Sequence, residues 1–305
     1  MSGSRECAKD WSDSLIKVID SINNTFLSAF FKKQWSFKIS TSYYVMSDIH
    51  GCYDDMIKML EQIAFTDEDT LILAGDYIDR GSQSFEMLKW IESNPKNVIF
   101  LRGNHDEEFA YSIDLMYGIL SQNECSESSL DDTKLIYELL RQLSLKQGNG
   151  VIFFDHYGTI RELIEIEGVT LEVLRRWADK IRNMDFFYRQ EINGKQYVVV
   201  HAGYIESLEG VDTDDTFDTL EDFYLYARDD AYIYGGFEHG IVVAGHTPTT
   251  LEEELPYNDG NVYKSYDEEM DCTFYDIDCG CASRNRRSNA KLACLRLDDE
   301  KIFYV

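Results

Sequence analysis

The sequence predicts an α/β fold, because short apolar runs alternate with segments of helical periodicity from Tyr43 onward. The runs Tyr43–Met46, Leu71–Ala74 and Val98–Leu101 are typical of buried strands. A polar block follows each of these runs, as in proteins whose strand ends carry a functional site. With 305 residues, 44% of them hydrophobic, the chain is long enough to form one large domain or two small ones with a real core.

The elements expected between and after these strands continue the alternation. Apolar residues at helical spacing predict one helix from Met56 to Ile63 and a second at Phe85–Ile91. The second half is rich in strands, and Asn193-Gly194 between two strand-like runs is a strong hairpin signal. The expected later strands are Phe187–Ile192, Lys195–His201, Ile241–Ala244, Thr273–Asp278, Leu292–Leu297 and Ile302–Val305.

Two segments are expected to lie outside the shared α/β pattern. Residues 1–40 predict an N-terminal helical extension, which either packs on the domain or docks a partner. Residues 41–305 then form the main domain, and the mainly helical stretch 107–189 is interpreted as a cap inserted beside the site. Apolar stripes in this stretch are expected to be core packing.

The charge of the chain restricts its partners. A net charge of −27 argues against binding to nucleic acid or to an anionic membrane, since both require a basic surface. It also means that a phosphorylated substrate must be attracted by a local positive site. No apolar run is long enough to cross a membrane, and Phe26–Phe31 lacks the features of a secretory signal.

The cysteines favour a cytoplasmic protein with reduced thiols. There are seven of them, an odd number scattered through a large chain. Cys272, Cys279 and Cys281 could bind zinc, but their spacing matches no common zinc finger. Buried or strand-edge thiols are therefore the preferred interpretation.

Five short blocks carry the chemistry, and each directly follows an apolar run. Together they deliver histidine, aspartate and asparagine from several strand ends, which is what a site for two metal ions requires. Any one block is common by itself, whereas five in order are specific. The blocks are SDIHG (Ser47–Gly51), GDYIDRG (Gly75–Gly81), RGNHD (Arg102–Asp106), VHAG (Val200–Gly203) and AGHTP (Ala244–Pro248).

Two divalent ions about 3.5–4 Å apart need roughly six protein ligands, one of them able to bridge. Asp76 is the candidate bridge, because it follows a strand end and can use both carboxylate oxygens. Mixed nitrogen and oxygen ligands suit manganese, iron or zinc better than calcium, and manganese is the expected metal. The six candidate ligands are Asp48, His50, Asp76, Asn104, His201 and His246.

Other residues of the same blocks are candidates for proton transfer and phosphate binding. Asp79 could orient His105, which would then protonate the leaving-group oxygen while a hydroxide held by metal attacks phosphorus in line. Arg80 and Arg102 adjoin these residues, and their guanidinium groups could bind phosphate oxygens.

At these residues the chain resembles the calcineurin-like metallophosphoesterase superfamily, most of all its phosphoprotein phosphatase branch. Within that branch, HAG, GHTP and the intervening YAR at Tyr226–Arg228 resemble bacterial serine/threonine phosphatases and symmetrical dinucleoside tetraphosphatases. The resemblance implies a four-layer αββα sandwich with metals at the strand ends, and it makes Arg228 a third phosphate ligand. It also implies that Asp48, His50 and Asp76 hold one ion and that the other is held by Asp76, Asn104, His201 and His246.

Two departures from the family pattern leave the substrate open. Asp106 stands where eukaryotic protein phosphatases usually have glutamate, and the helical stretch after Asn104 is longer than in compact members. The expected function is hydrolysis of phosphomonoesters, foremost as a serine/threonine protein phosphatase. Hydrolysis of a dinucleoside tetraphosphate is the alternative function. The aromatic residues that could stack on the bases of that substrate are Tyr111, Tyr117, Phe223, Tyr224 and Tyr226. A non-catalytic phosphate-binding scaffold is a third hypothesis, and the sequence does not indicate the oligomeric state.

Overall fold

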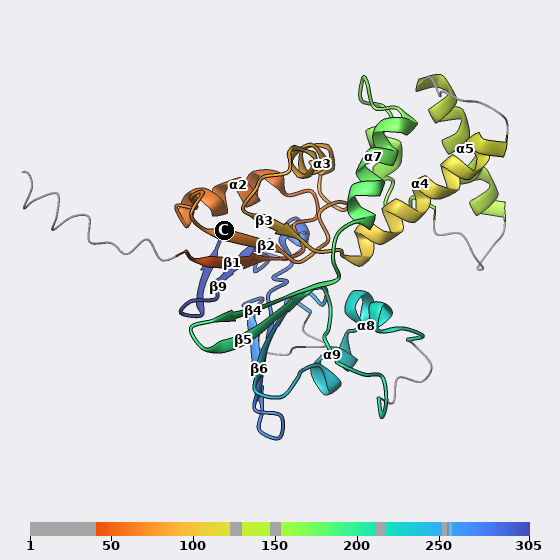
Figure 1. Ribbon diagram of the computed structural model, residues 1–305. Helices are drawn as coiled ribbons and strands as arrows, with labels where there is room; N and C mark the ends of the chain where they lie inside the picture. The colour runs from red at the N-terminus through yellow and green to blue at the C-terminus, as the bar shows by residue number, and fades with distance from the viewer. Residues whose placement is uncertain (1–40, 123–129, 147–153, 212–216, 252–254, 256–257) are drawn as a thin grey trace, which may run out of the picture. The chain divides into compact units, whose positions relative to one another are not determined.

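The computed structural model describes residues 41–122, 130–146, 154–211, 217–251, 255 and 258–305 (Figure 1). The predicted helix within residues 1–40 lies outside these ranges. Residues 42–305 form one compact unit, which holds every element discussed below.

The first sheet has the strand order β10-β9-β1-β2-β3. Its central strands β1, β2 and β3 run parallel, so their carboxyl ends meet at one edge. Strand β9 pairs antiparallel with both β1 and β10. The strands are β1 (Tyr43–Met46), β2 (Thr70–Leu73), β3 (Val98–Phe100), β9 (Ala293–Arg296) and β10 (Lys301–Tyr304).

The second sheet has the strand order β4-β5-β6-β8-β7, with β5, β6 and β8 parallel to one another. Its antiparallel hairpin β4–β5 turns at Asn193 and Gly194, which have φ angles of 52° and 80°, as a tight hairpin turn requires. The strands are β4 (Phe187–Ile192), β5 (Lys195–Val200), β6 (Gly240–Ala244), β7 (Tyr263–Asp267) and β8 (Cys272–Asp276).

The two sheets pack face to face, and helices cover their outer faces (Figure 1). Between the sheets lies an apolar layer in which Val45 and Ile72 of the first sheet meet Val199 and Val243 of the second. Helices α2 (Tyr53–Gln62) and α3 (Ser84–Ser93) cover the first sheet. The second is covered by α8 (Leu220–Tyr226) and α9 (Asp229–Tyr234). The α/β fold and the four-layer sandwich are therefore confirmed.

The described residues between β3 and β4 form four helices, which share the core of α2 and α3. Helix α7 has a continuous apolar face, with Leu171, Leu174, Trp177 and Ile181 buried. The interpretation of this stretch as a cap over the site stays a prediction. The helices are α4 (Asn104–Gln122), α5 (Leu130–Lys146), α6 (Thr159–Leu163) and α7 (Leu171–Arg182).

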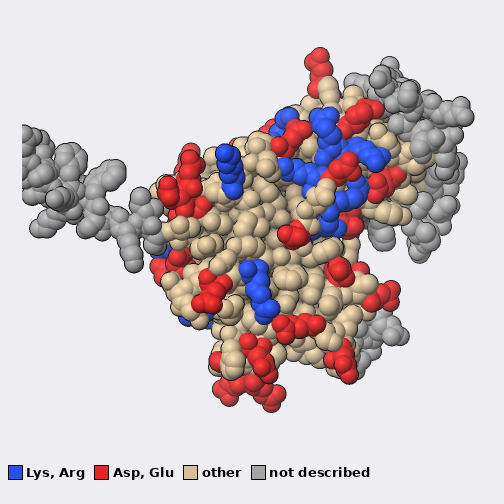
Figure 2. Space-filling model, in the orientation of Figure 1, with Lys and Arg blue, Asp and Glu red and all other residues tan. Residues whose placement is uncertain are grey.

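On the face shown in Figure 2, acidic side chains are scattered and Lys and Arg side chains gather in one patch. That gathering lies over α7, whose sequence includes Arg175, Arg176, Lys180 and Arg182. Arg176 pairs with Glu92 of α3 at 3.4 Å, and Arg182 pairs with Asp114 of α4 at 2.6 Å. These cations therefore join α7 to its neighbouring helices.

None of the helices in the described ranges is long and apolar enough to span a membrane.

Candidate active site

Hydrogen bonds tie the polar loops at the strand ends into one unit. The loop after β1 donates from the His50 amide to the Asp76 carbonyl at 2.8 Å. The His105 amide, at the start of α4, donates to Oδ1 of Asp76 at 3.0 Å. The two sheets are joined in the same way, because the His246 amide donates to Oδ2 of Asp48 at 2.9 Å.

The backbone of these loops is held in conformations that non-glycine residues rarely adopt. Asp48, His50, Asp76, Asp79 and His246 all have positive φ angles, between 44° and 70°. A non-glycine residue with a positive φ angle is strained, and it keeps this conformation only where surrounding contacts determine it. Such strain is often found at functional sites.

Close packing around the loops explains two of the glycines in the blocks. A Cβ atom at Gly103 would lie 2.3 Å from the amide nitrogen of Asp76. At Gly245 a Cβ atom would lie 2.2 Å from Oδ2 of Asp48. Both positions need glycine because the neighbouring backbone and carboxylate occupy the space of a side chain.

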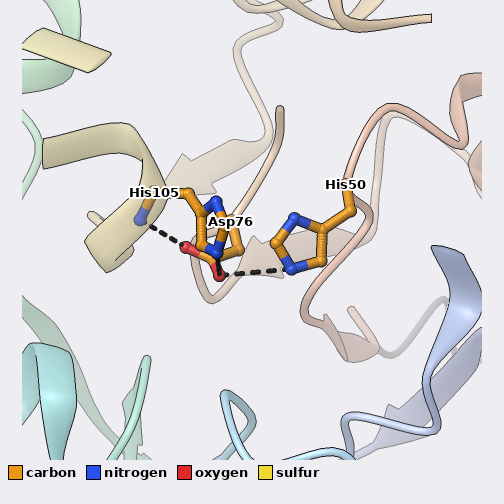
Figure 3. A group of neighbouring side chains, drawn as sticks. All are labelled: His50, Asp76 and His105. Atoms are coloured by element: carbon orange, nitrogen blue, oxygen red, sulfur yellow. Dashed lines mark hydrogen bonds and ion pairs between the residues drawn. The ribbon is translucent and has the colours of Figure 1, made fainter. Parts of the chain in front are cut away.

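Asp76 lies at the centre of two groups of buried side chains whose ligand atoms lie within 4.8 Å of one another. In the first group, the Nε2 atoms of His50 and His105 lie 3.3 Å and 3.8 Å from Oδ2 of Asp76 (Figure 3). In the second, Nε2 of His201 lies 3.5 Å from Oδ1 of the same carboxylate. The two oxygens of Asp76 thus face different groups, which is the arrangement expected of a bridging ligand.

Around His201 the second group contains further candidate ligands. Its Nε2 atom lies 3.0 Å from Oδ1 of Asn104 and 3.1 Å from Nδ1 of His246. These three residues come from α4 and from the ends of β5 and β6, so the two sheets contribute jointly to one cluster.

The hydrogen bonds of the histidines show that lone pairs converge at the centre. Nδ1 of His50 lies 2.8 Å from the carbonyl of Ile78, so Nδ1 carries the proton and Nε2 is left with a lone pair. His201 is fixed in the same way by the carbonyl of Ala74, at 2.8 Å. The Nε2 lone pair of His50 therefore faces an oxygen of Asp76, and that of His201 faces oxygens of Asp76 and Asn104. Lone pairs that face one another repel unless a cation lies between them.

Buried atoms without hydrogen-bond partners, and the shifted pKa values of the site, also indicate a cation between these residues. Oδ1 of Asp48 and Nε2 of His50 are buried, and neither has a hydrogen-bond partner among the described residues. Burial lowers the pKa of His50 to about 3, so this ring is neutral and able to bind a metal. Burial alone would raise the pKa of Asp76, but the neighbouring imidazoles hold it below its usual value, so Asp76 is ionised. This donor set fits divalent cations.

His105 is held differently from the other site histidines, because a carboxylate binds its second ring nitrogen. Nδ1 of His105 lies 2.6 Å from Oδ2 of Asp79, while Nε2 lies 2.9 Å from Nη2 of Arg80. Burial lowers the pKa of His105, but the Asp76 and Asp79 carboxylates outweigh burial and raise it overall. A raised pKa suits His105 to be an acid, although its position beside His50 and Asp76 would also allow metal binding.

The three candidate arginines have different surroundings. Arg80 is exposed and reaches His105. Arg228 is exposed, and its guanidinium donates to the carbonyl of His246 at 3.3 Å. Arg102 instead bonds Glu107 at 3.0 Å and the carbonyls of Arg182 and Met184. Arg80 and Arg228 thus lie beside the histidines with donors to spare, whereas most donors of Arg102 are already used.

Several contributing residues were not identified as site residues from the sequence. Asp106 accepts hydrogen bonds from the amides of Asp76, Tyr77 and Gly103, at 2.8 Å, 3.2 Å and 3.0 Å, and so fixes the loop that carries Asp76. Its place in the RGNHD block could have indicated this. Asp278 is buried, and the nearby charge of Asp48 adds to burial in raising its pKa well above the usual value. No sequence pattern marks Asp278.

Two further residues that contact the site, and that were not identified from the sequence, come from the helical stretch 107–189. Tyr157 places its ring 4.5 Å from that of His105, measured between centroids. Thr159 donates a hydrogen bond from its hydroxyl to Oδ1 of Asp79. Neither lies in a recognisable motif, so only the folded chain brings them to the site.

Residues 41–281 match the sequence profile of the calcineurin-like phosphoesterase family, and the chain belongs to this family. The match covers most of the chain and includes all of the candidate site residues. It confirms the family expected from the sequence and, at the level of the family, the expected class of enzyme, a phosphoric ester hydrolase. The identity of the metals and the roles of individual residues stay predictions.

Curated relatives resemble this chain over a shorter region. The symmetrical bis(5'-nucleosyl)-tetraphosphatases of Salmonella paratyphi B and Salmonella newport are each 45% identical to it over 64 residues. This region is 21% of the chain and 23% of each relative, so the match spans less than a quarter of the relatives' length.

Solved structures resemble the chain over most of its length at low identity. A crystal structure assigned to a diadenosine tetraphosphatase is 16% identical, with a TM-score of 0.48, and covers 88% of this chain and 94% of that one. A serine/threonine phosphatase from Saccharomyces cerevisiae is 14% identical, with a TM-score of 0.40, and covers 88% of this chain and 80% of that one.

Proposed function

We propose that the protein is a dinuclear metal-dependent phosphatase that hydrolyses phosphomonoesters, foremost phosphoserine or phosphothreonine in proteins. The observation that carries this proposal is the convergence of histidine lone pairs and carboxylate oxygens on both sides of Asp76, next to the hydrogen-bonded pair His105–Asp79. Metal ligands and a proton donor in one site are what phosphoester hydrolysis requires.

The metal-binding residues of this proposal form two sets that share Asp76. Asp48, His50 and Asp76 would hold one ion, and Asp76, Asn104, His201 and His246 would hold the other. Manganese is the preferred metal, with iron and zinc as alternatives, because the donors are nitrogen and oxygen without thiolate. When bound, the two ions would lower the pKa of a water molecule and neutralise charge on the phosphoryl oxygens.

His105 acts in this proposal as the acid that protonates the leaving-group oxygen. Asp79 keeps the proton on Nδ1 paired and the ring in place, as a carboxylate does for histidine in other acid–base catalysts. Arg80 and Arg228 would bind phosphate oxygens from the exposed side of the cluster, where their guanidinium groups have free donors. Arg102 remains a weaker candidate, because protein atoms already occupy most of its donors.

Hydrolysis of a dinucleoside tetraphosphate is the second candidate function. It is favoured by the 45% identity with symmetrical tetraphosphatases over 64 residues. Stacking of a base would need exposed aromatic rings, and of the five candidates Tyr111 and Tyr226 are 49% and 38% exposed. Phe223 and Tyr224 are buried at 0% and 7% exposure, so they are not available for stacking.

A substrate panel assayed with manganese separates these functions. We expect phosphoserine and phosphothreonine peptides to release phosphate with a higher kcat/KM than that for diadenosine tetraphosphate. Dominant release of nucleoside diphosphate would contradict the first proposal and support the second. The Asp76→Asn variant controls for contaminating phosphatases. Metal binding by the wild type without turnover of p-nitrophenyl phosphate would instead support a non-catalytic scaffold.

The setting in which the enzyme acts follows from its composition. The net charge of −27 and the free thiols of Cys52, Cys272, Cys279, Cys281 and Cys294 are typical of a cytoplasmic protein that binds neither nucleic acid nor membrane. The interpretation of the helical stretch as a cap beside the site is part of the same proposal, whereas residues 1–40 keep both alternatives, packing on the domain or docking a partner.

A further inference from the structure

A separate group of potential ligand atoms lies beside the candidate active site and has no role in the proposed function. The sulfurs of Cys52 and Cys281 and a carboxylate oxygen of Asp55 all lie within 4.8 Å of one another. Cys52 directly precedes α2 and is partly exposed, whereas Cys281 begins a short 3-10 helix (Cys281–Ser283) and is 3% exposed.

The contacts of Asp55 argue against a metal ion at this group. Arg284 forms an ion pair with Oδ2 of Asp55, the same oxygen that lies 4.0 Å from the sulfur of Cys281. A metal would have to displace this guanidinium or bind beside its positive charge. Arg284 also donates to the carbonyl of Val305, which holds it in position. The group is therefore a pair of thiols beside an ion pair.

The geometry points to a reversible disulfide between Cys52 and Cys281 that acts as a thiol switch on the active-site loop. The sulfurs of a disulfide are about 2 Å apart, so the two thiols must approach by less than about 3 Å. The partly exposed Cys52 can meet an oxidant in solution, and the buried Cys281 is placed to react with the product. An accessible thiol next to a resolving thiol is the usual arrangement of a redox-sensing pair.

A peroxide can drive the reaction in two balanced steps. The sulfur of Cys52 attacks one peroxide oxygen, the O–O bond breaks, and the products are a sulfenic acid at Cys52 and one water molecule. The sulfur of Cys281 then attacks the sulfur of Cys52, the S–O bond breaks, and the departing hydroxide takes the Cys281 proton as a second water. Two thiols are oxidised to one disulfide, and one peroxide is reduced to two water molecules. A dithiol reductant reverses the change.

The position of the pair links it to the candidate metal site. Cys52 follows His50 by two residues, and its sulfur lies 3.8 Å from the carbonyl oxygen of His50. Cys281 follows Asp278, whose carboxylate accepts from the Gly280 amide at 2.8 Å and is close enough to Asp48 to interact with its charge. A disulfide would therefore fix the loop carrying His50 to the loop carrying Asp278, and so would constrain the geometry of the first ligand set.

The test uses the full-length, manganese-loaded protein, treated with hydrogen peroxide and compared with an untreated sample. We expect the intact mass to fall by two hydrogen atoms and peptide mapping to identify a single Cys52–Cys281 cross-link. Turnover of p-nitrophenyl phosphate should fall in proportion to the cross-linked fraction and recover after treatment with dithiothreitol. Cys52→Ser and Cys281→Ser should each abolish the cross-link and retain turnover in peroxide.

Matched variants identify other sources of inactivation. A Cys7→Ser/Cys125→Ser double variant should behave like the wild type, because the pair is intact. Inactivation of Cys281→Ser equal to that of the wild type would point to oxidation of the metals and overturn the switch. A different cysteine pair, or a complete cross-link without loss of turnover, would overturn it as well. Since the turnover measurement rests on the proposed function, an inactive reduced enzyme would contradict that function, whereas the mass measurement tests the disulfide independently.

Discussion

Thr159 donates a hydrogen bond to the Asp79 carboxylate, although 80 residues separate them in the chain. The other oxygen of Asp79 binds His105. The hydroxyl and the imidazole thus bind different oxygens of the same carboxylate. Tyr157 lies against the His105 ring from the same segment. The helical stretch therefore contributes directly to the position of the proposed proton donor.

Replacing Thr159 by valine should slow the step that needs the acid. A hydrogen bond to a charged group contributes about 1.5–3 kcal/mol, so turnover of substrates with poor leaving groups should fall roughly tenfold or more. Turnover of p-nitrophenyl phosphate, whose leaving group needs less protonation, should change little. Thr159→Ser retains the hydroxyl and is the matched control. An equal loss on both kinds of substrate would indicate a general structural defect instead.

Replacing His105 by asparagine should remove the acid and keep the metals. Loss of a general acid lowers turnover by about 100-fold or more, and the loss should be largest for alkyl phosphates. Metal content, measured by inductively coupled plasma mass spectrometry after dialysis, should equal that of the wild type. A marked loss of metal would identify His105 as a ligand, which its distance of 3.8 Å from Asp76 also permits.

Replacing Asp76 by asparagine should have the opposite effect, because both candidate ligand sets share this carboxylate. Neutralising it removes one negative charge and one of two ligating oxygens, so the dialysed variant should contain less manganese than the wild type. The matched control is Asp67→Asn, an exposed aspartate away from the site, which should keep its metal. Full metal occupancy in Asp76→Asn would contradict the bridging role.

Arg80 and Arg102 should respond differently to replacement by lysine, which cannot form the same forked hydrogen bonds. Arg80→Lys should raise KM for phosphomonoesters roughly tenfold, corresponding to the loss of one charge-assisted hydrogen bond. Arg102→Lys should instead lower the free energy of unfolding by about 1–3 kcal/mol, because buried carbonyl groups lose their donor. Urea denaturation and steady-state kinetics measure both effects. A raised KM for Arg102→Lys at unchanged stability would restore its predicted role in phosphate binding.

Asp155 should make the stability depend on pH. Its carboxylate accepts from the amide of Ile160 at 2.8 Å, and burial raises its pKa to about 6. Between pH 4 and 6 the Asp155 carboxyl is therefore ionised in the unfolded chain but still protonated in the folded one. As pH rises through this range, ionisation favours unfolding by up to about 3 kcal/mol. Relative to the wild type, Asp155→Asn should gain that stability as pH rises from 4 to 7, measured by urea denaturation. Asp179→Asn, at an exposed carboxylate, should show no such gain.

Much of the architecture could be predicted because short segments of the sequence specify individual strands, helices and turns. The strand Tyr43–Met46 was predicted with its observed bounds, and the hairpin at Asn193-Gly194 follows from the backbone freedom that its turn requires. The candidate ligands could be predicted because polar residues after parallel strands meet at one sheet edge. Strand β7 and helices α8 and α9 were not predicted, since β7 is mostly exposed and the two helices are short.

Other parts of the site depend on contacts between segments far apart in the chain. The Thr159–Asp79 hydrogen bond and the Cys52–Cys281 pair join residues whose separation is fixed only when helices and loops pack, and no local pattern encodes that packing. The sequence by itself determined the family, the α/β fold and the set of candidate metal ligands. Only the tertiary structure decided which lone pairs converge on Asp76 and which arginine is already engaged, because hydrogen-bond geometry arises from packing in three dimensions.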